Sequence, residues 1–131
     1  MPTPPAVALV DAWHAALNAG DADRVVALSA VDVRIVGPRG TATGAAVLRD
    51  WVGRSGIRLQ AERWFHRGND VVVAQQATWR DPETGETGAP LPVATAFRVR
   101  DYLVARIARF DDLDAALADA EMGLTDELAR A

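Results

Sequence analysis

The sequence contains no cysteine and no lysine, and only two histidines. The absence of cysteine excludes disulfides, thiolate nucleophiles, iron–sulfur clusters and cysteine-ligated zinc. Because all 14 basic residues are arginine, the chain can form no Schiff base and offers no anchor for pyridoxal phosphate. Two histidines are too few for a three-histidine metal site. We therefore expect no metal and no cofactor.

Positive charge is also in deficit, since 18 acidic residues outnumber the 14 arginines and leave a net charge of −4. Nucleic-acid binding requires clustered positive charge, so no nucleic-acid partner is expected. The most apolar early stretch, Ala6 to Leu17, contains Asp11 and His14 and is too short to span a bilayer. The first five residues lack the basic and apolar regions of a secretory signal. These features predict a cytoplasmic protein without a membrane partner.

The 131 residues are expected to form a single domain, with a core over about residues 6–120 and a C-terminal tail over 121–131. In the first half, periodic apolar residues predict three helices, and alternation predicts one strand, over 31–36. The second half alternates in four strands joined by turns, at 57–67, 71–80, 93–100 and 103–110. Asp21 is expected to cap the second helix, and Asp111 or Asp112 a last helix. Helices followed by an antiparallel meander are typical of an α+β fold.

Several short motifs add to this order of segments. They are the run Ala15–Asp21, a first strand that ends in Gly37 and Pro38, and the segments Phe97–Asp101 and Arg109–Leu113. With them, the chain resembles the nuclear-transport-factor-2-like superfamily, and within it the ketosteroid isomerases and SnoaL-like polyketide cyclases. The resemblance implies a strongly bent antiparallel sheet wrapped around the N-terminal helices into a cone, a cystatin-like α+β barrel with an internal pocket. It also implies a homodimer formed through the outer face of the sheet.

The residues that ketosteroid isomerases use for catalysis are replaced in this sequence. By the resemblance, the position of the catalytic carboxylate falls on Gly37, and the two donors that hold the enolate oxygen fall on Trp13 and Thr95. The related limonene-epoxide hydrolases need a pair of aspartates inside the cone, but Glu62 is the only acidic residue in the strands predicted at 57–67 and 71–80. Neither activity is therefore expected.

Strand alternation and the resemblance together predict which residues line the pocket. The strands contribute Ile35, Gln75, Trp79, Thr95 and Phe97, and the helices contribute Trp13 and Trp51. On the last strand, Arg106 and Phe110 point inward if the turn at 101–102 keeps register, whereas a slip of one residue would bring in Ile107 and Arg109. Arg106 could bind an anionic group, pair with an acidic residue or lie outside. The leading hypothesis is a small hydrophobic molecule with an anionic or carbonyl group near Arg106.

Two other hypotheses stay open at this point. In the first, the chain is a cyclase, isomerase or hydrolase acting on a hydrophobic substrate, and His14, His66 or Asp32 moves a proton. His14 is expected at the pocket rim or on the surface. In the second, the cone is packed shut and the outer face of the sheet binds another chain. Arg98 and Arg100 are expected on that face, either paired with a partner or solvated.

Overall fold

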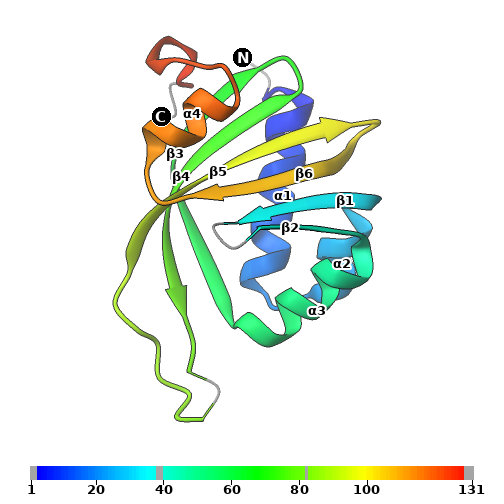
Figure 1. Cartoon of the computed structure of the whole chain (residues 1–131), viewed down its shortest axis with the longest axis vertical. Coiled ribbons are helices and arrows are strands. Elements are labelled where there is room, and N and C mark those ends of the chain that lie inside the picture. The colour runs from blue at the N-terminus through cyan, green and yellow to red at the C-terminus, as the bar shows by residue number, and fades with distance from the viewer. Residues whose placement is uncertain (1–2, 38–39, 82, 129–131) are drawn as a thin grey trace.

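The computed structural model describes residues 3–37, 40–81 and 83–128, and Figure 1 shows a curled sheet with helices on both faces. The first half of the chain forms α1 (Pro5–Asn18), α2 (Ala22–Ala27), β1 (Ser29–Gly37), β2 (Gly40–Thr43) and α3 (Ala45–Ser55). The second half forms β3 (Ile57–Arg67), β4 (Asp70–Trp79), β5 (Leu91–Arg100), β6 (Leu103–Phe110), α4 (Leu113–Asp119) and a 3₁₀ turn, Leu124–Asp126. The predicted α+β class is confirmed. Residues 38–39, where the first predicted strand ends, and 129–131 of the predicted tail lie outside the described residues.

The six strands form one sheet in the order β2-β1-β6-β5-β4-β3. Neighbouring strands are antiparallel except β1 and β6, which run parallel. The sheet curls without closing, because β2 and β3 remain its two edges. The sequence did not predict β2, since its four residues, Gly40–Thr43, are mostly exposed and carry no alternating apolar pattern.

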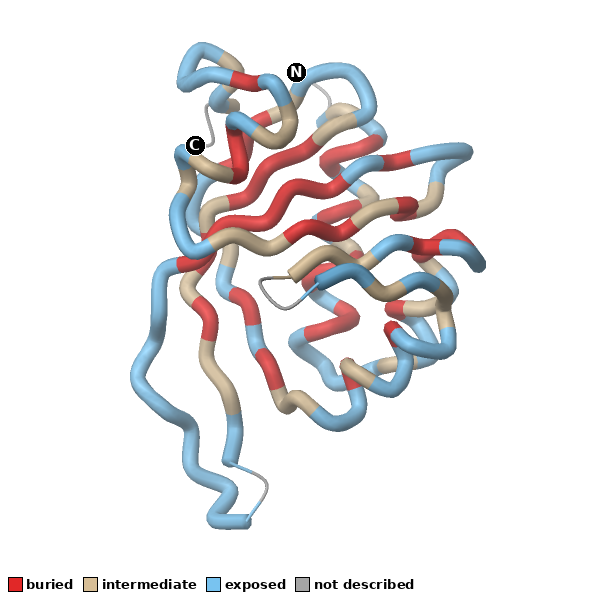
Figure 2. Tube along the Cα trace, viewed as in Figure 1, coloured by how far each residue is buried: buried red, intermediate tan, exposed pale blue. Residues whose placement is uncertain are grey.

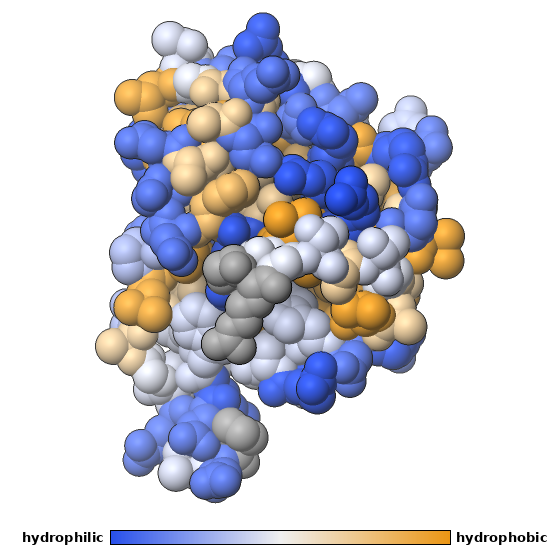
Figure 3. All heavy atoms as spheres, viewed as in Figure 1, coloured by the Kyte–Doolittle hydropathy of each residue, from blue (hydrophilic) through white to orange (hydrophobic). Residues whose placement is uncertain are grey.

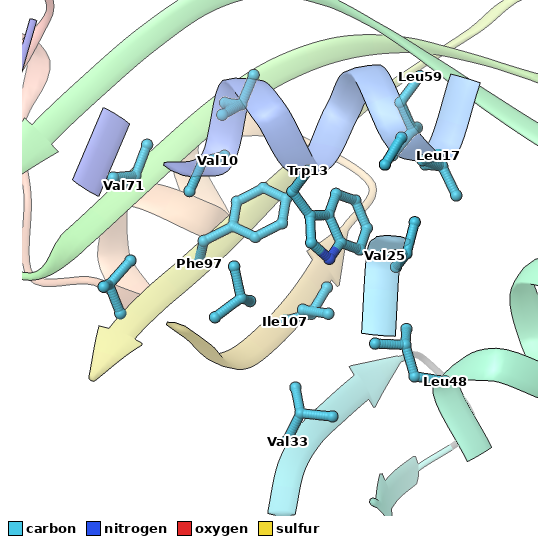
Figure 4. Packing of buried hydrophobic residues seen from close by; sticks show 14 of the residues in the cluster. Val10, Trp13, Leu17, Val25, Val33, Leu48, Leu59, Val71, Phe97 and Ile107 are labelled. Atoms are coloured by element: carbon cyan, nitrogen blue, oxygen red, sulfur yellow. The ribbon is translucent and has the colours of Figure 1, made fainter. Parts of the chain in front are cut away.

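Helix α1 lies against the concave face of the sheet, and the main hydrophobic core fills the space between them (Figures 1 and 4). Trp13 and Phe97 are the largest fully buried side chains in it, each at most 1 % exposed. A second, smaller core lies on the opposite face, where α4 packs on β4, β5 and β6, and it includes Leu117, Val72 and Ala96. The central strands are therefore buried on both sides, as the runs of red along β4 and β5 in Figure 2 show.

Two aspartates begin the short helices as the sequence predicted. The side chain of Asp21 accepts a hydrogen bond from the backbone N–H of Arg24 at 3.1 Å and so caps α2. Of the two candidates for the last helix, Asp112 provides the cap, with the N–H of Ala115 at 2.8 Å. Such caps satisfy N–H groups that have no partner within the helix.

The last strand departs from simple alternation at a β-bulge. Arg98 on β5 lies opposite Arg106 on β6, but the next residue, Val99, lies opposite Val104, so Ala105 is an extra residue. A bulge reverses which side chains face inward on the residues beyond it. Past the bulge, the residue that faces the core is therefore Ile107 rather than Arg106.

The outer face of the sheet carries the arginines that the sequence placed there. Within this chain Arg98 pairs with Asp70 at 3.0 Å and Arg100 with Asp32 at 2.6 Å. On the side of the molecule that carries α4, hydrophobic residues form small separate groups among hydrophilic ones (Figure 3). Association of two copies through this face stays a prediction.

A helix needs about 20 predominantly apolar residues to cross a bilayer. No helix in the described ranges is long and apolar enough to cross a membrane.

Candidate functional site

A cavity of about 130 Å³ lies between α1, α3 and the concave face of the sheet. Its walls are mainly apolar, and among the described residues Thr95 and Arg109 line it with polar side chains. The lining residues in the described part of the chain are Trp13, Ile35, Val36, Gly37, Leu48, Trp51, Ile57, Leu59, Thr95, Ile107 and Arg109. A buried apolar cavity of about 150 Å³ holds a benzene ring. The cavity as shaped therefore fits a group of about one six-membered ring.

The residues predicted to line the pocket fall into three groups in the structure. Trp13, Ile35, Trp51 and Thr95 line the cavity directly. Gln75 and Phe97 are buried behind this wall, each 1 % exposed, and Trp79 packs beside it at the edge of the core. Arg106 and Phe110 lie on the other face of the sheet, which corrects the register predicted from the sequence.

Arg106 is held by a carboxylate on the outer face instead of facing the cavity. Its two terminal nitrogens donate to the two carboxylate oxygens of Asp119 on α4, at 2.7 and 3.0 Å. This two-point hydrogen bond raises the pKa of the Arg106 guanidinium above its usual value. The bulge at Ala105 is the cause, because without it Arg106 would lie opposite the inward-facing Phe97.

Arg109 occupies the inward position that the sequence offered as the alternative. It is half-buried, lines the cavity, and places its guanidinium carbon 5.6 Å from the centre of the Trp79 ring. Stacking on an indole leaves the N–H groups of a guanidinium available at its edge. Within the described part of the chain, no carboxylate forms an ion pair with Arg109.

Trp13 contributes a ring surface rather than a hydrogen-bond donor. Its indole N–H points to the hydroxyl of Ser29, 3.3 Å away, and that hydroxyl donates to the carbonyl of Val25 at 2.7 Å. The Trp13 ring meets Phe97 edge to face, with centres 5.2 Å apart (Figure 4). The indole is fixed on both sides and is preorganised as an apolar wall.

A line of buried hydrogen bonds runs from the cavity wall into the core. The Thr95 hydroxyl donates to Gln75 Oε1 at 2.7 Å, and Gln75 Nε2 lies 2.7 Å from His14 Nε2. His14 Nδ1 in turn lies 2.8 Å from the carbonyl oxygen of Val10. Among the described residues no buried side-chain N or O atom lacks a hydrogen-bond partner, so the network is fully satisfied.

His14 is buried, contrary to the expectation that it lies at the rim or on the surface. It is 4 % exposed and packs between Trp64 and Phe97, with ring centres 5.5 Å away in each case. Burial lowers the pKa of the imidazole, more than the Val10 carbonyl and the charge of Asp11 raise it. The sequence held a signal for this position, because residue 14 follows Val10 by four and precedes Leu17 by three.

The other two candidates for proton transfer lie away from the cavity. Asp32 is exposed and bound to Arg100, which lowers the pKa of its carboxyl. His66 donates from Nε2 to the carbonyl of Gly68 at 2.9 Å. It lines a larger, open hollow of about 590 Å³ beside the first turn of α1. The described residues also contain no group of three or more His, Asp or Glu side chains that could hold a metal.

Solved structures share this architecture. An NTF2-like protein of unknown function from Cytophaga hutchinsonii superposes with a TM-score of 0.74 at 16 % identity, covering 86 % of this chain and 95 % of that one. TerC, co-crystallised with polyporic acid, superposes with a TM-score of 0.72 at 22 % identity, and the match covers 91 % of this chain and 98 % of TerC. A proposed polyketide cyclase from Xanthomonas campestris pv. campestris superposes with a TM-score of 0.70 at 25 % identity, and the match covers 87 % of this chain and 95 % of that one.

Sequence comparison narrows this likeness to one family. No curated protein matches the chain. Residues 10–107 match the family described as the SnoaL-like domain, which is about three quarters of the sequence. The match includes β1 and β3 to β5, most of β6 and the residues of the cavity wall except Arg109. The chain therefore belongs to the SnoaL-like domain family.

Proposed function

We propose that this chain binds a small, largely apolar organic molecule whose ring enters the cavity and whose anionic or carbonyl group lies at Arg109. The observation that carries the proposal is the position of Arg109: the residue lines a mainly apolar cavity, and its guanidinium has no ion-pair partner among the described residues. A partly desolvated guanidinium without a carboxylate carries a free-energy cost, and a ligand acceptor would offset that cost.

The size and shape of the cavity define the ligand further. At about 130 Å³, it accepts one ring, and a larger molecule would extend out of the opening. TerC, which shares the fold, was co-crystallised with polyporic acid, and this supports a small-molecule ligand here. We propose binding and assign no reaction, because His14, His66 and Asp32, the residues considered for proton transfer, all lie outside the cavity lining.

Tryptophan fluorescence tests the proposal, because Trp13 and Trp51 form part of the cavity wall. Three one-ring probes separate the polar contribution from the apolar one: benzoate, acetophenone and ethylbenzene. We expect saturable changes, with benzoate binding tightest and ethylbenzene weakest. A flat response to all three probes would reject the proposal.

Two arginine variants form a matched pair for the same titration. Arg109→Gln should weaken benzoate binding about tenfold, because a charge-assisted hydrogen bond is lost. Arg106→Gln should leave the affinity unchanged, since Arg106 is bound to Asp119 on the other face. Equal effects of the two substitutions would show that Arg109 is not the ligand contact.

A further inference from the structure

The direction of every hydrogen bond behind the cavity wall follows from one backbone carbonyl. A carbonyl oxygen can only accept, so His14 Nδ1, 2.8 Å from the oxygen of Val10, must carry a proton. The buried imidazole is neutral, and a neutral imidazole has only one N–H. His14 Nε2 is therefore an acceptor, directed at Gln75.

The Gln75 side chain connects His14 to Thr95 at the cavity wall, so the direction of the hydrogen bond at His14 also fixes the one at Thr95. The atom that faces His14 Nε2 at 2.7 Å must be a donor, which makes it the amide nitrogen. The amide oxygen then faces Thr95 at 2.7 Å and can only accept. The Thr95 proton is consequently committed to Gln75, and the Thr95 oxygen has only lone pairs to offer to the cavity.

Thr95 and Arg109 lie side by side with opposite hydrogen-bonding character. They are direct partners across β5 and β6, a position in which Cβ atoms are about 5 Å apart. Both line the cavity. Arg109 can only donate, whereas Thr95 is left with only acceptor sites. Two neighbouring residues of the cavity wall therefore differ in character, one with an oxygen that can only accept and the other with a cationic donor.

We propose that this pair of residues selects one-ring molecules that carry a hydroxyl or amino donor close to their anionic or carbonyl group, such as hydroxy acids. The donor binds the Thr95 oxygen and the acid binds Arg109. An ether, a fluorine or a second carbonyl at the donor position would place two acceptors against each other. This inference rests on the function proposed above and adds the ligand class.

A series of substituted benzoates tests the polarity of Thr95 in the native protein. We expect 3-hydroxybenzoate and 3-aminobenzoate to bind about tenfold more tightly than 3-fluorobenzoate and 3-methoxybenzoate. Fluorine serves as the small control, because it is close to a hydroxyl in size and cannot donate. Equal affinity of 3-hydroxybenzoate and 3-fluorobenzoate would overturn the inference while leaving the function intact. Failure of every benzoate to bind would overturn both.

Three variants locate the preference in the buried network. Thr95→Val should abolish the advantage of 3-hydroxybenzoate over 3-fluorobenzoate, and Thr95→Ser should keep it. Gln75→Met should release the Thr95 proton, so that the preference for donors falls while benzoate still binds. A preference that persists in both Thr95→Val and Gln75→Met would refute the role of these residues.

The network can also be tested without a ligand. The ¹⁵N chemical shifts of the His14 ring report which nitrogen carries the proton. We expect the neutral Nδ1–H form at neutral pH. The Nε2–H form or a charged ring would reverse the order of donors and acceptors and would overturn the inference. Because this measurement uses the native protein, its outcome does not depend on whether the variants fold.

Discussion

The burial of His14 predicts that the stability of the folded chain depends on pH near neutrality. The imidazole is 4 % exposed, and both of its nitrogens are engaged by Val10 and Gln75. Burial holds the pKa of His14 below its usual value in the folded state, and the charge of Asp11 acts against this. In the unfolded chain the ring is solvated and regains a pKa of about 6.5.

Unfolding therefore takes up a proton whenever the pH lies between the two pKa values. The unfolded state binds more protons in this window, so stability rises with pH and is greatest above about 6.5. The free energy of unfolding drops by at most about 1.4 kcal/mol between pH 7.5 and pH 5.5, the limit reached when the folded ring stays neutral over the whole range. A smaller lowering of the His14 pKa gives a smaller drop in the free energy of unfolding, with the same sign.

Urea denaturation at the two pH values measures this change. With a slope of about 2 kcal/mol per molar urea, the midpoint should fall by up to about 0.7 M at the lower pH. The carboxyls of Asp32 and Glu127 have lowered pKa values and stay ionised throughout this range. His14→Gln should remove the dependence, whereas the matched control His66→Gln should retain it. A midpoint that does not change with pH, or a dependence that survives in His14→Gln, would refute the reasoning.

Three further predictions concern stability, and urea denaturation measures each of them. Phe97→Ala should cost about 3–5 kcal/mol, because it opens a cavity beside Trp13, and Phe97→Leu should cost clearly less. A double-mutant cycle of Arg106→Ala and Asp119→Ala should give a coupling of about 1–2 kcal/mol for a half-buried, two-point ion pair, and a coupling near zero would contradict this. Asp112→Ala should cost about 1 kcal/mol through loss of the α4 cap, whereas Asp111→Ala should cost little.

The features that the sequence predicted well have local causes. Asp21 and Asp112 cap helices through contacts only three residues away, and the two-residue turn between β5 and β6 fixes where those strands begin. Alternation also placed Thr95 on the concave face, since a strand without irregularities has a period of two. Such patterns are visible in a single sequence because both partners lie close together in it.

The features that the sequence missed depend on partners far apart in the chain. His14 is buried because β3, β4 and β5 curl around α1. This curvature brings Trp64, Gln75 and Phe97 into contact with the His14 ring. The bulge in β6 likewise has no sequence mark of its own, since Ala105 is an ordinary strand residue. Both errors arose from extending a local rule past the point where tertiary contacts set the geometry.

The extra residue at Ala105 decides the chemistry of the cavity. With regular alternation, Arg106 would face the core opposite Phe97, where a guanidinium would be desolvated among apolar rings, and Arg109 would point outward. The bulge avoids this cost, because it turns Arg106 to Asp119 and places Ile107 in the core. The same reversal brings Arg109 beside Thr95 near the end of β6, where both residues line the cavity. A single backbone irregularity thus provides both the ion pair that fastens α4 and the cation proposed to bind the ligand.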